Sequence, residues 1–563
     1  MLKRILPLFF LILIFAPVFV FADYLDQRKD FFVESSFDKS GREKIEGILK
    51  KLTPRIYFYV DAKWWGDLTA EQQKKNEDIL EKLGVEFHAK IYPDLTKEFG
   101  TEWRPGIDNE SMIYVLYAPM KDNAGGYFRE KDEQLKIIAK DSNQAEIIFL
   151  NSDFIDSKLN SSFLAHEFEH LIDFYQKEKR LGLPEETWLV EARNEYAPTF
   201  LGYDNDYQGS SFQGAVKSFL NNPRDSITEW LGKPSDYGAL SVFTHYLVEH
   251  YGVGILSESL KINKIGIPSI NETLRARNYQ KDFGDIFSDW AVASYVNDCS
   301  LGTEYCYLNE NLKNFRISPT INLIPLTGAS TLAVTDTIKP WSAHWIKFIA
   351  GEGKLRLTFI GNPENLFKVP FVLQKNDNSF EIGNLKLDES QRAELDISGF
   401  GNKYKSLTII PSLQSKLVGF DGEETAFSYF WSVSLEKEEK TTMISGDLAK
   451  LRKLLEEINK LEMRIKQLKN ILLAMLEAGA EKETTCGQFF NDLSFGLINN
   501  EEVRCLQQFL KNQGTEVYPA GLITGSFADL TKEAVKKYQA LRGLPVTGAF
   551  DSLTREKANS ELK

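Results

Sequence analysis

The sequence has few cysteines, no excess of positive charge and, after its first residues, no long apolar run. Four cysteines occur among 563 residues, and their spacings match no zinc ribbon. The net charge of −13 argues against a nucleic-acid partner, because phosphate backbones attract basic surfaces. No later run is long enough to cross a bilayer. The 43% hydrophobic content is ordinary for globular proteins, and the length suggests three or four domains.

The N-terminus has the three parts of an export signal. Lys3 and Arg4 are basic, residues 5–21 are almost entirely apolar, and Ala22 ends the run with a small side chain before Asp23. An uncleaved membrane anchor is the alternative, but the run is slightly short for one and lacks a stop-transfer flank. We therefore expect cleavage near Ala22 and a secreted or envelope-associated chain.

The cysteines form two local pairs. Cys299 and Cys306 lie close together in the sequence, as do Cys486 and Cys505, and each pair falls within one expected domain. Because exported proteins fold where thiols are oxidised, we predict two disulfides rather than a metal cluster.

Hydrophobic patterns predict a multidomain α+β chain. Strand patterns at 55–60, 113–117 and 146–150 are joined by a helix pattern at 71–83, and residues 160–315 are mostly helical in pattern. Asn160, Ser161 or Ser162 is expected to cap the first of these helices. Another helix, over 237–251, should end at Gly252.

The hydrophobic pattern of the rest of the chain changes twice. Residues 318–437 show short alternating runs between turns, which is typical of an all-β sandwich. Residues 447–478 carry four heptads, which fit either a parallel homodimeric coiled coil or a lone helix packed on a neighbour. Three short helices are expected near 500–512, 529–541 and 551–561. The expected segments are 1–22 (signal peptide), 23–54 (N-terminal extension, with a pro-segment as one interpretation), 55–316 (mixed β/α domain), 318–437 (β-sandwich), 447–478 (coiled coil) and 484–563 (three-helix domain).

One helix has the spacing of a zinc site. His166 and His170 are four residues apart, so both imidazoles lie on one helix face with Glu167 beside them. A catalytic Zn²⁺ needs a third protein ligand and an open position for water. Glu191, on the next helix, is the candidate ligand. Glu195, one turn further on, is placed to accept a hydrogen bond from a ligand histidine.

This constellation resembles the gluzincin metalloproteases, of which thermolysin is the best known, and in particular the hyicolysin family. The resemblance extends over about residues 55–260. Ala192 and Arg193 depart from the glycine and the small or apolar residue that are common after the ligand glutamate. The phrases that carry the resemblance are 165–174, 188–192, 125–128, 142–143 and 237–239.

The resemblance implies a thermolysin-like domain and a zinc-dependent endopeptidase that hydrolyses proteins or peptides. Glu167 would act as general base towards the zinc-bound water. Tyr237 or His245 would stabilise the oxyanion, although a packed core position is favoured for His245. Substrate would bind along an edge strand before the metal helix. The matching segment is Glu146, Ile147, Ile148, Phe149 and Leu150.

The C-terminal segment resembles the small peptidoglycan-binding domain of envelope enzymes. The match rests on residues 503–510, 524–539 and 548–554, although Thr524, Ala528 and Asp551 depart from its usual residues. Peptidoglycan is therefore an expected partner. Two alternatives to a general endopeptidase stay open: a non-catalytic wall-binding or adhesion protein, and a peptidase that cuts peptidoglycan cross-links.

Overall fold

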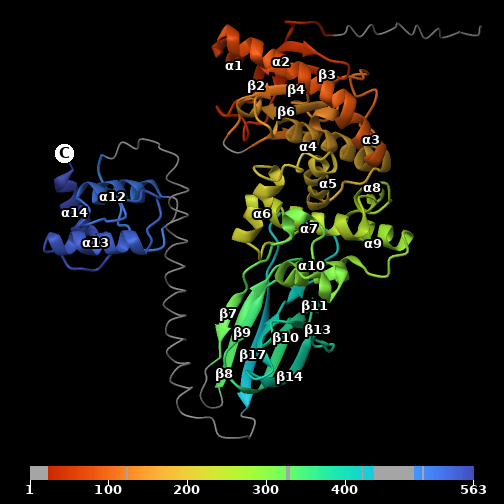
Figure 1. Cartoon of the computed structure of the whole chain (residues 1–563). Helices are drawn as coiled ribbons and strands as arrows, with labels where there is room; N and C mark the ends of the chain where they lie inside the picture. The colour runs from red at the N-terminus through yellow and green to blue at the C-terminus, as the bar shows by residue number, and fades with distance from the viewer. Residues whose placement is uncertain are drawn as a thin grey trace, which may run out of the picture. The chain divides into compact units, whose positions relative to one another are not determined.

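The structure is a computed structural model that describes residues 23–121, 124–324, 330–420, 422–436, 487–497 and 500–562. Contacts divide the chain into two compact units, residues 1–438 and 439–563 (Figure 1). The expected signal peptide and the coiled-coil segment lie outside the described residues. Among the residues described, no helix combines the length and the apolar character needed to cross a bilayer.

The first unit begins with a six-stranded mixed sheet in the order β1-β2-β3-β4-β6-β5. Strands β3, β4 and β6 run parallel and every residue in them is buried, which explains their nearly unbroken apolar sequences. The other neighbours are antiparallel. The strands are β1 (Arg28–Phe32), β2 (Lys44–Leu52), β3 (Ile56–Asp61), β4 (Ile113–Ala118), β5 (Gly126–Phe128) and β6 (Ile147–Asn151).

Residues 23–54 belong to this sheet and are not a separate extension. Strand β1 pairs with β2, and β2 pairs with β3. Phe31 and Leu49 are buried against Tyr57 and Tyr59 in one cluster. The expected boundary at residue 55 is wrong, because the pairing that joins these strands is a tertiary contact that a local pattern does not reveal.

Helices cover the face of the sheet opposite the cluster of Phe31 and Tyr59. Helices α2 and α4 form where the sequence predicts them, whereas α3 was not predicted. Helix α2 starts with a capping box in which the Thr69 hydroxyl accepts from the Gln72 amide. The predicted cap of α4 is wrong: its N-cap is Leu159, and no side chain caps it. The Asn160 side chain accepts instead from the Tyr117 hydroxyl (2.7 Å) and donates to the Ile155 carbonyl (2.9 Å). These helices are α2 (Ala70–Glu86), α3 (Tyr92–Phe99) and α4 (Asn160–Asp173).

The helical half continues from α5 to α10. Helix α7 starts at Pro234 and ends before Gly252, whose φ of 80° stops the helix as predicted. After α10, Cys299 and Cys306 form the first predicted disulfide. Cys505 is also disulfide-bonded, and Cys486 lies outside the described residues. The helices are α5 (Thr187–Phe200), α6 (Ser211–Asn221), α7 (Pro234–Tyr251), α8 (Gly254–Ser259), α9 (Gly266–Ala276) and α10 (Phe283–Val296).

An all-β region follows, as predicted, but as one continuous nine-stranded sheet. Its two halves are joined where β14 pairs with β15 through the single pair Phe400–Tyr404. The halves curl around a shared core, in which Phe348 and Trp431 lie 4.9 Å apart. Strands β11 (Phe367–Lys368) and β16 (Ser412–Leu413) form a separate two-stranded antiparallel sheet. The nine strands are β7 (Thr320–Leu323), β8 (Ser330–Ile338), β9 (Ile346–Ile349), β10 (Gly353–Gly361), β12 (Pro370–Lys375), β13 (Phe380–Asn384), β14 (Arg392–Phe400), β15 (Tyr404–Ile409) and β17 (Phe427–Glu436).

The second unit contains the three expected helices, α12 (Glu501–Asn512), α13 (Asp529–Leu541) and α14 (Ser552–Glu561). Two buried glutamines organise it in the same way. Gln507 accepts from the Gly525 amide and donates to the Ser526 carbonyl, and Gln539 accepts from the Gly548 amide and donates to the Ala549 carbonyl. Each amide therefore ties a helix to the turn that follows it.

Candidate metal centre

Helices α4 and α5 bring the three predicted ligands together. His166 Nε2 lies 3.5 Å from Glu191 Oε2, and His170 Nε2 lies 3.8 Å from Glu191 Oε1. One ligand atom of each residue lies within 4.8 Å of the other two, and the described chain holds no second group that meets this criterion. The spacing of four residues on α4 and the packing of α5 against it create this geometry.

The other nitrogen of each imidazole faces a side chain of α5. His166 Nδ1 lies 3.3 Å from Glu195 Oε1, and Ser241 donates to the same carboxylate (3.1 Å). His170 Nδ1 lies 2.8 Å from Asn194 Nδ2, while Asn194 Oδ1 has no hydrogen-bond partner among the residues that the structure describes. Turning the amide over lets Oδ1 accept from the imidazole N–H, which leaves Nε2 unprotonated for a metal.

The donor set fits Zn²⁺. Burial lowers the pKa of His166 to about 4 and the pKa of His170 well below its usual value, so both rings are neutral, as metal ligands must be. Glu191 is buried, and its Oε2 accepts no hydrogen bond from the described residues. A buried carboxylate oxygen without a partner is costly, and a cation held by His166, His170 and Glu191 would remove that cost.

Glu167 lies beside this group in a cavity of about 710 Å³, which His166, Glu195 and Tyr237 also line. Burial, and then the charges of Glu191 and Glu195, raise the pKa of Glu167 well above its usual value. Glu167 Oε2 has no hydrogen-bond partner among the described residues. The side chain is therefore free to bond a water or substrate in the cavity.

The predicted substrate strand needs correction. Segment Glu146, Ile147, Ile148, Phe149 and Leu150 is not an edge, because β6 lies between β4 and β5 and its backbone pairs on both sides. The Glu146 carboxylate is buried and accepts from the Ile107 amide (2.8 Å). The edge strand is β5, which lines the cavity through Gly126. The Gly-Gly-Tyr-Phe phrase at 125–128 was the sequence signal for it.

Gly126 allows this edge strand to approach the metal helix. A Cβ at Gly126 would lie 2.6 Å from the Phe149 carbonyl oxygen and 3.0 Å from Glu167 Cγ. Any larger residue would push β5 away from α4, so glycine sets the width of the cavity beside Glu167.

Tyr237 and His245, the two oxyanion candidates, have different surroundings. Tyr237 packs its ring on Trp230 (4.7 Å) at the cavity wall, and burial together with the charges of Glu191, Glu195 and Glu167 raises its pKa. His245 stacks on Phe212 at 3.5 Å and lies 3.3 Å from the Thr199 hydroxyl, as a core residue does.

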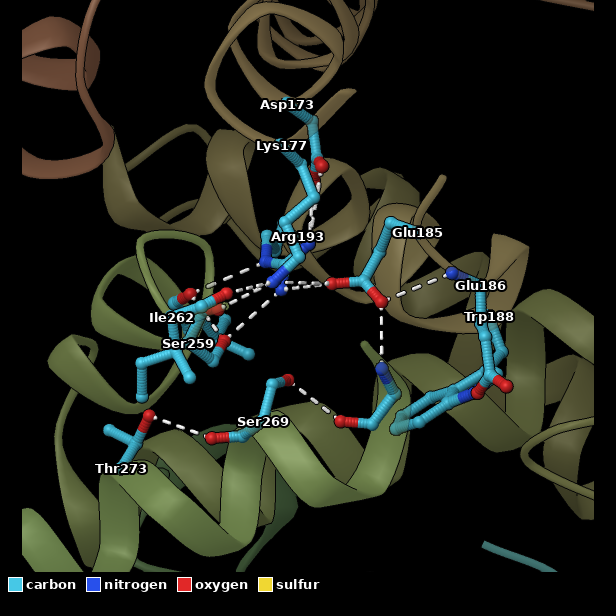
Figure 2. A network of polar contacts seen from close by, with 12 residues as sticks. Asp173, Lys177, Glu185, Glu186, Trp188, Arg193, Ser259, Ile262, Ser269 and Thr273 are labelled. Atoms are coloured by element: carbon cyan, nitrogen blue, oxygen red, sulfur yellow. Dashed lines mark hydrogen bonds and ion pairs between the residues drawn. The ribbon is translucent and has the colours of Figure 1, made fainter. Parts of the chain in front are cut away.

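A buried network of ion pairs and hydrogen bonds connects α5 to neighbouring segments of the chain (Figure 2). The Arg193 guanidinium donates to Asp173 at the end of α4 (2.9 Å), to Glu185 (3.1 Å) and to Ser259 (3.1 Å). Lys177 adds an ion pair with Glu185 (3.4 Å). Arg193 is one of the two residues that depart from the pattern of the gluzincins that the sequence resembles. Its bonds clamp the helix that carries Glu191 onto α4 and α8.

Comparisons with known proteins bear on the C-terminal unit. Residues 499–557 match the family described as "Putative peptidoglycan binding domain", which confirms the predicted resemblance of this segment. No protease family model matches. No curated protein matches the chain.

Three solved structures match about a fifth of the chain each. They are the pre-peptidase C-terminal domain of a Bacillus anthracis collagenase (8% identity, 21% of this chain, 96% of that one, TM-score 0.15), the Yersinia pseudotuberculosis-derived mitogen (12%, 20%, 92%, TM-score 0.14) and PliG, a periplasmic inhibitor of g-type lysozyme from Aeromonas hydrophila (13%, 21%, 100%, TM-score 0.15). At such low TM-scores these likenesses carry no argument about function.

Proposed function

We propose that the chain is a zinc-dependent endopeptidase of the gluzincin type, with a thermolysin-like catalytic domain, and that it works in the cell envelope. The observation that supports this most is that His166, His170 and Glu191 lie together, next to a cavity that His166 and Glu167 line. A purely structural zinc site has four protein ligands, whereas three ligands and an adjacent cavity leave a position for water.

Each residue then has a defined task. Bound Zn²⁺ supplies a Lewis acid that lowers the pKa of water and polarises a carbonyl. Glu167 takes the proton of the attacking water and passes it to the leaving amine. Tyr237 donates its hydroxyl hydrogen to the developing oxyanion. Strand β5 pairs with the substrate backbone, because it is the free edge next to Glu167.

The C-terminal unit supports the location. Its family match and the expected export signal both fit a chain that binds peptidoglycan outside the cytoplasm. That match also favours the second candidate, a wall-binding protein without activity. The two candidates differ in one respect: only the peptidase needs the paired histidines and the uncommitted Glu167 carboxylate.

The decisive test compares Glu167→Gln with Glu169→Gln in the exported chain. Both glutamates are buried on α4, but Glu169 does not line the cavity. We expect about one zinc per chain in all three proteins by metal analysis, and chelator-sensitive cleavage of casein in the wild type and Glu169→Gln. Glu167→Gln should cleave at least about a thousandfold more slowly.

Three results would change the proposal. Unchanged cleavage by Glu167→Gln would refute its role as general base. Strong pull-down by purified peptidoglycan with no chelator-sensitive proteolysis would favour the wall-binding protein. Release of new amines from purified wall, with casein left intact, would favour a peptidase specific for wall cross-links.

A further inference from the structure

The segment between β5 and β6 exposes three apolar side chains, which we call the apolar tip: Leu135, Ile137 and Ile138. Their side chains are 51%, 90% and 72% exposed. Ile137 is the most exposed large apolar side chain in the described part of the chain. Single exposed apolar residues are common, but several gathered on one turn form a patch of the kind that marks a contact site.

The turn that carries the apolar tip is held in place. The Ile138 and Ala139 amides both donate to the Leu135 carbonyl, at 2.7 and 3.0 Å. At the base, the buried Ser142 hydroxyl donates to the Gln134 carbonyl (2.6 Å), and the buried Asp132 carboxylate accepts from the Asn143 amide (2.8 Å). These bonds fix the backbone of the turn while its three apolar side chains are exposed.

The base is also tied to the metal helix. Lys179, in the π-helical continuation of α4 (Phe174–Lys179), donates to the Glu133 carbonyl at 2.8 Å. Glu133 itself is fully buried. The apolar tip therefore moves with α4 and with the edge strand β5 rather than as an independent loop.

Two lysines accompany the apolar tip: Lys136 lies between Leu135 and Ile137, and Lys140 follows Ile138 by two residues. Lys136 and Lys140 are exposed, and neither pairs with a carboxylate in the part of the chain that the structure describes. The neighbouring acidic residue Asp141 already pairs with Lys131 (2.6 Å) and Arg129 (3.3 Å), so it does not compensate these two lysines. An apolar centre with unpaired cations beside it is complementary to a surface that is anionic outside and apolar beneath.

We propose that the apolar tip inserts into the surface of a membrane that contains anionic lipids, with Lys136 and Lys140 at the headgroups. A protein partner fits less well, because a stable protein interface needs about 800 Å² and some 20–30 residues a side. Three apolar side chains on a narrow turn suit the headgroup region of a bilayer, into which amphipathic segments reach about 5–10 Å. This proposal does not depend on peptidase activity.

The test uses the mature chain, residues 23–563, with vesicles of phosphatidylcholine alone or with about a third phosphatidylglycerol. We expect co-sedimentation with the anionic vesicles and at least tenfold weaker binding to the neutral ones. The double variant Ile137→Ser/Ile138→Ser should lower binding to anionic vesicles at least tenfold. Lys136→Gln/Lys140→Gln should lower it by a smaller factor and flatten its dependence on salt.

A matched control is Leu417→Ser/Val418→Ser, an exposed apolar pair in the β region (45% and 46% exposed). It should bind as the wild type does. Ile137→Trp provides a direct readout, because insertion shifts its fluorescence to the blue only with anionic vesicles. Unchanged binding of Ile137→Ser/Ile138→Ser overturns the proposal. So does a concentration-dependent dimer that this variant abolishes without any vesicle binding, which would assign the apolar tip to self-association.

Discussion

Replacing Arg193 by methionine should destabilise the first unit, residues 1–438, more than any change of a surface charge. Methionine keeps much of the apolar stem but removes the guanidinium. Arg193 is 0% exposed, and its partner Asp173 is 2% exposed. The carboxylate of Asp173 would lose both bonds from Arg193 and remain buried. Glu185 would keep its ion pair with Lys177 and its bond from the Gly266 amide (2.7 Å).

The expected cost is therefore mainly that of one uncompensated buried carboxylate, about 3–5 kcal/mol. The assay is urea unfolding followed by tryptophan fluorescence, with Arg277→Met as control. Arg277 pairs with Glu258 at 2.8 Å on the surface, and its loss should cost at most about 0.5 kcal/mol. Since α5 also carries Glu191, Arg193→Met should weaken zinc binding about tenfold.

A double variant separates the effect of the unpaired charge on stability from the effect of lost packing. Adding Asp173→Asn to Arg193→Met removes the unpaired charge, so the double variant should be more stable than the sum of the two single losses predicts, by roughly 1–3 kcal/mol. A loss below about 1 kcal/mol for Arg193→Met alone, or additive losses in the double variant, would refute the argument that this network holds α5 in place.

Three further predictions follow from the same structure. Tyr237→Phe should lower kcat about 100-fold with little change in KM or zinc content, because it removes one donor to the oxyanion; steady-state kinetics with metal analysis checks this. Burial raises the pKa of Glu146 to about 7, so its protonated form is favoured in the folded state and stability is lost as pH rises from about 4.5 to 7. Glu146→Gln should therefore gain up to about 3 kcal/mol at pH 8 and nothing at pH 4, as measured by urea unfolding at both values. Replacing Cys299 and Cys306 by serine opens a loop with a sequence separation of 7 and should cost about 2–3 kcal/mol in the same assay.

Each of these three has an outcome that contradicts it. Equal kcat in Tyr237→Phe would leave the oxyanion to another donor. A gain for Glu146→Gln that is the same at both pH values would show that packing, not ionisation, limits stability there. No change in the cysteine variant would mean that the segment after α10 is held by its other contacts, such as the bond from His250 to the Cys306 carbonyl.

Features that depend on short stretches of chain could be predicted from the sequence. The strands at 55–60 and 146–150 and helix α7 were expected within a few residues, because periodicity, Pro234 and Gly252 act locally. Both histidines and Glu167 lie in five consecutive residues, so helix geometry alone brings them to one turn. Glu191 could be proposed because α5 is the next α-helix along the chain after α4.

Features that depend on pairing between distant segments could not be predicted from the sequence. Whether β5 or β6 is the edge, and whether residues 23–54 join the sheet, follow from hydrogen bonds between strands far apart in sequence. The prediction that Asn160 caps α4 was wrong because its side chain accepts a hydrogen bond from the Tyr117 hydroxyl on β4 instead. Asn194 stood beside the predicted Glu195, but only the helix packing shows that it faces His170.

The sequence by itself therefore determined which groups this chain is able to offer: two imidazoles and Glu167 within five residues of one helix, Glu191 on the next helix, and a recognisable C-terminal domain. Tertiary structure alone decided which strand borders the cavity, which side chains orient the imidazoles, and which carboxylates pair with the charge of Arg193. The physical reason is that spacing along a helix is set by local backbone geometry, whereas edges, clefts and buried ion pairs exist only after distant segments have packed together.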